Sequence, residues 1–171
     1  PILITIFSRC GTCITEEYLN CLFNTLISNG DNKNAFYNIN PETWNPKFGD
    51  HFTNKTMKEL FELLDKPYIA GLSLLGGDPL YPDNREEIIN LCREFKERFP
   101  DKNIWCWTGY TYEEIKDLEI LNYINILIDG KFILEQRDVT LKWRGSPNQR
   151  IINVNKSKEL NKIVLYDCEE N

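Results

Sequence analysis

Strand-like and helix-like segments alternate through the middle of the chain, and this order constrains the fold more than any other feature. Short apolar runs predict buried strands, and amphipathic segments between them predict helices. Strands are expected at 2–7, 71–75, 103–108 and 124–128, and helices at 15–28, from 53 or 54 to about 67, from 83 or 84 to 99, and at 112–121. Because a strand, helix, strand order places neighbouring strands parallel, the predicted fold class is α/β.

Turn residues follow three of the expected strands, at 76–79, 108–110 and 129–131. The carboxyl ends of parallel strands meet at one edge of a sheet, so these turns are expected to lie together. Ligands bind at this edge in α/β proteins. We therefore expect the functional site there. Residues 29–52, rich in Asn and aromatic residues, predict a long irregular loop.

The turn Gly76-Gly77-Asp78-Pro79 is the sharpest local feature. Two glycines let the backbone approach a ligand closely, and Asp78 adds a carboxylate that suits an amino-acid-like ligand. A tight βα turn in which Asp78 caps a helix or the turn itself explains the same residues. The phosphate-binding pattern Gly-x4-Gly-Lys-Ser/Thr is absent from the chain.

Three other features have both a functional and a structural interpretation. The segment 105–110, with Trp105 and Trp107, could pack an adenine or ribose, and core packing explains it as well. The basic stretch 142–150 could bind an acidic partner or be a solvated turn. His51 is the only histidine, and no local motif places it in a hydrolytic site.

Composition excludes several classes of protein. The net charge is −6, which disfavours nonspecific binding to nucleic acid or anionic membranes. No apolar run is long enough to span a bilayer. Six cysteines in 171 residues are too few for a disulfide scaffold. With no secretion-type leader at its start, the chain is expected to be one soluble domain, 1–171, in the reducing cytoplasm.

Five segments of the chain form a recognisable set when taken in order. They are Asn40-Pro41-Glu42-Thr43-Trp44, Gly71 to Leu80 (GLSLLGGDPL), Ile104 to Tyr110 (IWCWTGY), Ile128-Asp129-Gly130-Lys131-Phe132 and Trp143 to Arg150 (WRGSPNQR). Together they resemble one family, the activating proteins of anaerobic ribonucleoside-triphosphate reductase, which are radical S-adenosylmethionine enzymes. The resemblance covers about 40–152, and 1–36 does not match.

The resemblance implies an incomplete (β/α) barrel of the radical SAM type, with a long irregular loop before the first regular βα units. It implies two cofactors, a [4Fe-4S] cluster and S-adenosylmethionine. In the family, the reduced cluster cleaves S-adenosylmethionine to a radical that removes hydrogen from a glycine of the reductase. By this resemblance, Gly76, Gly77, Asp78 and Pro79 bind the cofactor, the reductase is the protein partner, and an electron donor is required. No catalytic residue is assigned.

The family's cluster motif, Cys-x3-Cys-x2-Cys, is missing. Counting back from Asn40 places its ligands at Asp31, Ala35 and Asn38, none of which supplies a thiolate. Cys10, Cys13 and Cys21 have a different spacing and lie earlier, so no metal ligand is assigned and no stoichiometric cluster is expected. A frame or splice error, natural loss of the cluster or an engineered change would each explain this boundary.

Three functions remain open at this stage. The first is a radical-generating activating enzyme. The second is a non-catalytic homologue that binds the cofactor or the partner. The third is a thiol-redox protein that uses Cys10 and Cys13, which requires thiols of lowered pKa.

Overall fold

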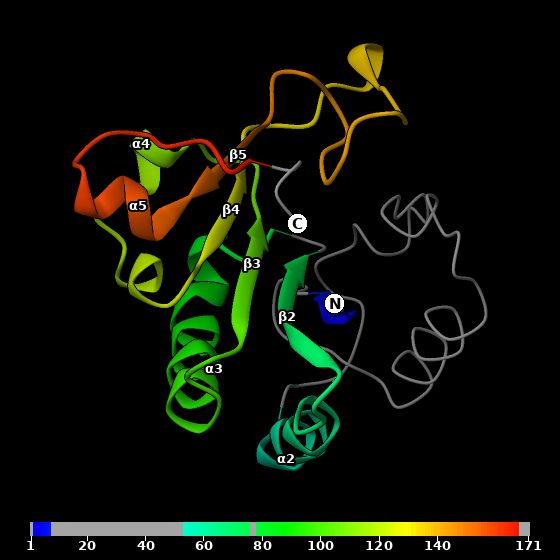
Figure 1. Cartoon of the computed structure of the whole chain (residues 1–171), viewed down its shortest axis with the longest axis vertical. Coiled ribbons are helices and arrows are strands. Elements are labelled where there is room, and N and C mark those ends of the chain that lie inside the picture. The colour runs from blue at the N-terminus through cyan, green and yellow to red at the C-terminus, as the bar shows by residue number, and fades with distance from the viewer. Residues whose placement is uncertain (1, 8–52, 76–77, 168–171) are drawn as a thin grey trace.

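The computed structural model describes residues 2–7, 53–75 and 78–167 (Figure 1). Their strands form one five-stranded sheet in the order β1-β2-β3-β4-β5. The first four strands are parallel, and β5 is antiparallel to β4. This confirms the α/β class. The strands are β1 (Ile2–Phe7), β2 (Ile69–Leu75), β3 (Asn103–Trp107), β4 (Ile126–Asp129) and β5 (Arg150–Asn153).

The helices follow the expected order in the described part of the chain. Thr53 caps the first of them, where its Oγ1 accepts a hydrogen bond from the Thr56 N–H at 3.3 Å. The predicted start of this helix is confirmed. The α-helices are α2 (Asn54–Leu64), α3 (Arg85–Arg98), α4 (Tyr112–Ile115) and α5 (Val154–Glu159), and the 3-10 turns are η2 (Pro82–Asn84), η3 (Glu119–Asn122) and η4 (Leu134–Gln136).

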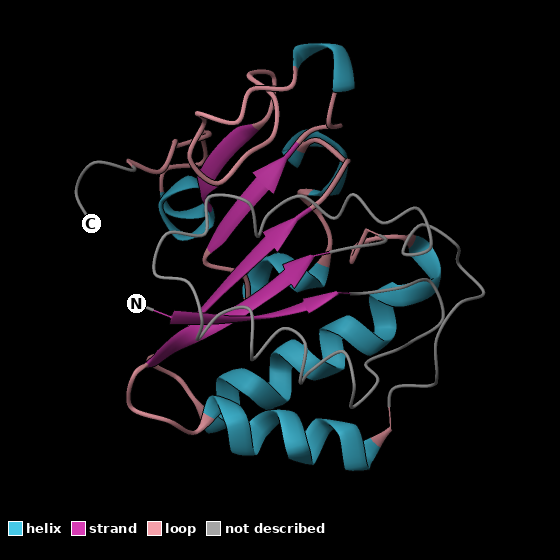
Figure 2. Ribbon diagram, turned by 90° about the vertical axis from the view of Figure 1, so that its right-hand side faces the viewer, coloured by secondary structure: helices cyan, strands magenta, loops and turns pink. Residues whose placement is uncertain are grey.

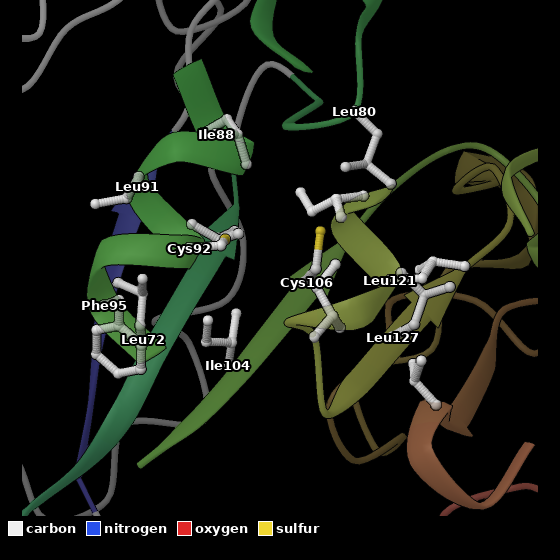
Figure 3. Close-up of a cluster of buried hydrophobic side chains, with 14 of the residues drawn as sticks. Leu72, Leu80, Ile88, Leu91, Cys92, Phe95, Ile104, Cys106, Leu121 and Leu127 are labelled. Carbon is white, nitrogen blue, oxygen red and sulfur yellow. The ribbon is translucent and has the colours of Figure 1, made fainter. Parts of the chain in front are cut away.

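One face of the sheet carries the main core. The strand register puts Leu72 beside Ile104 and Cys106 beside Leu127, and all four side chains are buried. Figure 3 shows side chains of α3 packing over these strand residues. The same cluster includes apolar residues of α2, α4, η3 and α5. The described α-helices therefore pack against a single face of the sheet. Figure 2 shows the twisted sheet together with these helices.

A smaller aromatic cluster covers the other face. Trp105 of β3 is buried there with Ile126, Ile128 and Ile151. Its ring lies 5.9 Å from that of Trp107, 5.1 Å from that of Trp143 and 5.5 Å from that of Tyr166. The core-packing interpretation of Trp105 is therefore confirmed.

The prediction of one helix over 112–121 is wrong. The chain forms α4, turns, and forms η3, and Leu118 between them has extended backbone with ψ 134°. Ile115 and Ile120 are both 1% exposed. In a continuous helix these positions would point about 140° apart. The break lets both side chains reach the core.

No helix in the described ranges is long and apolar enough to cross a membrane.

Gly71 is required by the close approach of β2 and β3. A Cβ built on Gly71 would lie 1.9 Å from the backbone oxygen of Asn103. We predict that Gly71→Ala lowers the free energy of unfolding by about 2 to 3 kcal/mol, measured by urea denaturation.

Gly109→Ala is the matched control, because the atom nearest to a Cβ built on Gly109 would be an Asp78 carboxylate oxygen, at an ordinary contact distance of 3.5 Å. Equal stability of the two variants would contradict the steric argument.

Candidate functional site

Asp78 lies just beyond the carboxyl end of β2 and links it to β3. One carboxylate oxygen, Oδ1, accepts hydrogen bonds from the Leu80 N–H at 2.9 Å and the Thr108 hydroxyl at 2.8 Å. The other, Oδ2, accepts from the Gly109 N–H at 2.9 Å. The side chain therefore clamps the ends of two neighbouring strands together.

The backbone of Asp78 is also constrained. Its φ of 51° lies in the left-handed region, which Asp tolerates better than most residues. Its carbonyl oxygen accepts from the Tyr81 N–H at 3.1 Å and from Asn84 Nδ2 at 3.2 Å. Three donors already occupy most of the acceptor capacity of the carboxylate. The structural interpretation of Asp78 is confirmed, and its direct contact with a cofactor stays a prediction.

The ends of β2, β3 and β4 form one connected edge, as the sequence predicts. Thr108 is buried, and its Oγ1 accepts from the Tyr110 N–H at 3.2 Å while donating to Asp78. The Tyr110 carbonyl in turn accepts from the Gly130 N–H at 2.9 Å. Gly130 has a φ of 91°, a conformation that favours glycine. Pro79 is buried next to Asp78, and Gly76 and Gly77 lie outside the described residues.

A second charged group joins β4, β5 and α4. Asp129, at the end of β4, is 1% exposed and accepts from Arg150 Nε at 3.0 Å and from the Tyr112 N–H at 2.7 Å. Arg150 also makes a two-pronged contact with Glu113, at 3.0 and 2.7 Å. Hydrogen bonds from Arg150 lower the pKa of Glu113 to about 2, and the two carboxylates raise the pKa of Arg150.

The basic stretch 142–150 divides into structural and exposed charges. Arg144 donates to the Gln149 carbonyl at 2.7 Å, and Arg150 is bound as described above. Lys142 is exposed. The stretch is therefore more than a solvated turn, because Arg144 holds the backbone and Arg150 holds two carboxylates.

The described cysteines are poor metal ligands. Cys92 and Cys106 are fully buried in the main core. Burial raises the pKa of Cys92 to about 12 and that of Cys106 well above its usual value. In the described part of the chain, no three His, Cys, Asp or Glu side chains are grouped to hold a metal ion. The other sequence candidates, Cys10, Cys13, Cys21, His51 and positions 31, 35 and 38, lie outside the described residues.

The sequence places positions 108 and 129 at this edge, but it does not identify the partners of their side chains. Thr108 bonds Asp78, which is 30 residues away, and the partners of Arg150 are 21 and 37 residues away in sequence. No local pattern identifies such partners.

The Glu113–Arg150 pair makes a pH-dependent contribution to stability. The pKa of Glu113 is below its ordinary 4.5 in the folded chain, so the contribution is full above pH 4.5 and is lost as the pH falls toward 2. Because the Glu113 side chain is 59% exposed, we predict a loss of only about 0.5 kcal/mol for Glu113→Gln at neutral pH.

Urea denaturation at decreasing pH checks this prediction, since the difference between wild type and Glu113→Gln is expected to shrink with acidification. Glu59→Gln is the control for removing one surface carboxylate, because Glu59 contacts Lys55 only at 3.6 Å. A Glu113→Gln difference that persists unchanged at low pH would contradict the assignment.

Comparison with known proteins adds a family to this geometry. Residues 9–152 match the family model described as 4Fe-4S single cluster domain. That span includes Cys10, Cys13 and Cys21, upstream of the motifs that begin at residue 40. No solved structure matches the chain significantly.

Curated relatives cover about two thirds of the chain. A protein of Enterobacteria phage T4 is 57% identical over 113 residues, which is 66% of this chain and 71% of the relative. Proteins of Vibrio cholerae and Escherichia coli K12 are 44% and 39% identical, over 66% and 64% of this chain and 75% and 74% of their own lengths. All three are named anaerobic ribonucleoside-triphosphate reductase-activating protein. With these identities and the matched cluster domain, the chain belongs to the family of anaerobic ribonucleoside-triphosphate reductase-activating proteins.

Proposed function

We propose that this chain is an activating enzyme that uses S-adenosylmethionine and a [4Fe-4S] cluster to generate a glycyl radical on anaerobic ribonucleoside-triphosphate reductase. The observation that carries the proposal is the clamp around Asp78. It fixes the residue that directly follows Gly76 and Gly77, at the edge where the strand ends converge. In the radical SAM family, this turn contacts the methionine part of the cofactor.

The sheet topology supports an incomplete (β/α) barrel. The strands lie in the order of the sequence, and the described helices pack against one face. A doubly wound sheet instead reverses its strand order and carries helices on both faces. In a barrel the strand order runs on without reversal, with all helices outside. We infer that the face lined by Trp105 is the inner face and that residues 1–171 form one domain.

In this proposal the chain's own residues hold S-adenosylmethionine rather than react with it. The backbone of Gly76 and Gly77 contacts the cofactor, Asp78 and Pro79 fix the turn, and Thr108 positions Asp78 through its hydroxyl. A bound cluster would supply one electron to S-adenosylmethionine, whose cleavage would release methionine and the radical that removes a hydrogen atom from a glycine of the reductase. A separate donor must reduce the cluster.

The described residues do not fit the cluster. Their two cysteines are buried, protonated thiols, and no other group of metal ligands lies among them. Thiolates for the cluster must come from outside the described ranges, where Cys10, Cys13 and Cys21 fall inside the matched family span.

The missing cluster motif favours a second candidate, a non-catalytic homologue that retains the cofactor turn or the partner surface. Asp31, Ala35 and Asn38 stand where the family's cysteines are expected. A chain without cluster ligands could still bind S-adenosylmethionine or the reductase, but it could not generate a radical.

Anaerobic reconstitution with iron and sulfide separates the two candidates. The missing Cys-x3-Cys-x2-Cys motif predicts no stoichiometric cluster, whereas an activating enzyme that uses Cys10, Cys13 and Cys21 as ligands would hold about four irons per chain, with the broad absorption of a thiolate-bound cluster. Replacing Cys10 and Cys13 together by Ser is expected to abolish both signals.

Replacement of Cys92 by Ser is the control, since its buried thiol is not a ligand. Wild type that retains no iron would contradict radical chemistry in this chain and leave the non-catalytic homologue.

The cofactor turn is tested by equilibrium dialysis with labelled S-adenosylmethionine. We predict that Gly77→Val abolishes binding, because a β-branched side chain fills the space that the backbone needs. Thr108→Val removes the hydroxyl that donates to Asp78 and is expected to weaken binding about tenfold, or ~1.4 kcal/mol.

Thr108→Ser is the matched control, because it keeps the hydroxyl and should restore affinity. Unchanged binding in both Gly77→Val and Thr108→Val would assign this edge a purely structural role.

A further inference from the structure

The connection between β4 and β5 is much longer than its geometry requires. Asp129 and Arg150 are register partners in the antiparallel pair, yet residues 130–149 separate them. Adjacent antiparallel strands can be joined by about two to five residues. This segment, the β4–β5 loop, contains only one 3-10 turn, η4, and projects beyond the sheet (Figure 1). Long structured loops of this kind usually carry function.

Side-chain hydrogen bonds close the base of the β4–β5 loop. Gln149 accepts from the backbone N–H groups of Gly145 at 2.8 Å and Ser146 at 3.2 Å, and its Nε2 donates to the Gly130 carbonyl at 3.1 Å. Asn148 Nδ2 donates to the Lys131 carbonyl at 2.8 Å. Both ends of the loop are therefore tied together.

Close packing fixes the middle of the loop as well. The ring of Phe132 lies so close to Gly145 that a Cβ there would meet it at 2.8 Å. Trp143 has a φ of 64°, a strained value for a bulky residue, and its carbonyl accepts from Trp107 Nε1 at 2.8 Å. The two sides of the loop are thus packed against each other and against β3.

The outward side chains are apolar and basic. Leu134 is 67% exposed, Val139 54% and Phe132 41%, and these are three of the seven large hydrophobic residues exposed in the described part of the chain. Removal of such side chains from water when a partner binds is the main source of binding free energy at protein interfaces. The loop carries four cations, the exposed Lys131, Arg137 and Lys142 and the half-buried Arg144. It carries two carboxylates, the exposed Glu135 and the half-buried Asp138, so its net charge is positive.

The positive charge of the loop contrasts with the net charge of the whole chain, which is −6. A projecting loop lacks the concave shape that binds small molecules. An apolar tip on a loop of net positive charge is complementary to a protein surface that is acidic and has exposed apolar residues.

We propose that the β4–β5 loop is a docking element, and that its occupant is an acidic, apolar surface of the reductase. This inference rests on the proposed function, which makes the reductase the partner. Leu134 and Val139 supply the apolar contact, and Lys131 supplies a positive charge at the rim of that contact.

The test measures binding of the purified reductase to the full-length chain by biolayer interferometry. Leu134→Asp and Val139→Asp are each expected to weaken binding about tenfold or more. Leu160→Asp is the matched control, because Leu160 is also 54% exposed but follows α5. Lys131→Glu should slow association and flatten its salt dependence, whereas Lys55→Glu on α2 should not.

Thermal stability and S-adenosylmethionine binding of each variant provide independent readouts. Both should match wild type in Leu134→Asp, since the side chain is exposed and far in sequence from the Asp78 turn. Normal reductase binding by Leu134→Asp and Val139→Asp would overturn the docking inference and leave the proposed function intact.

Two other outcomes would also overturn the inference. Failure of wild type to bind the reductase would remove the proposed partner and the docking element together. Sedimentation of the chain alone tests a second copy as the occupant. A wild-type dimer that Leu134→Asp converts to a monomer would assign the loop to self-association.

Discussion

The carboxylate of Asp78 is the interaction on which the geometry of the strand edge depends. Parallel strands are hydrogen-bonded along their length, but the peptide groups beyond their ends need other partners. Asp78 supplies one for the N–H groups of Leu80 and Gly109 and for the Thr108 hydroxyl. A left-handed backbone conformation costs about 1 kcal/mol or more for a non-glycine residue, and these hydrogen bonds offset that cost. The position of the turn after β2 is thereby coupled to the end of β3.

Arg150 has the corresponding role on the other side of the edge, where it holds the carboxylate of Asp129. A carboxylate as buried as that of Asp129 is stable only when it is paired and hydrogen-bonded. Arg150 provides the pairing from β5 and reaches Glu113 in the first turn of α4. The antiparallel strand therefore does more than extend the sheet, because it fixes α4 against the end of β4.

Much of the fold between 53 and 130 could be predicted because its signals are local. Thr53 precedes an apolar stripe and caps α2, and the run at 71–75 is buried as its composition indicates. The helix expected at 112–121 failed because burial of both Ile115 and Ile120 outweighed the local preference for a continuous helix. The antiparallel direction of β5 depends on pairing with β4, which no short sequence pattern encodes.

The site divides in the same way. Asp78 was found because it adjoins two glycines and a proline, all within four residues. The sequence places position 108 at the same edge, but the hydrogen bond from Thr108 to Asp78 could not be predicted, since 30 residues separate the two side chains and only the strand register brings them together. The cluster ligands could not be predicted for a different reason. The family's cysteine motif is local in sequence, but the positions expected for its cysteines hold Asp31, Ala35 and Asn38.

A continuous path of hydrogen bonds joins the proposed docking loop to the proposed cofactor turn. Gln149 at the loop base bonds Gly130, Gly130 bonds Tyr110, and Tyr110 bonds the Thr108 hydroxyl that holds Asp78. Hydrogen transfer between two proteins requires the reacting atoms to be placed to within about 1 Å. A loop anchored to the same edge as the proposed cofactor turn would provide that constraint, because hydrogen bonds of 2.8 to 3.2 Å would then set the separation between partner contact and cofactor.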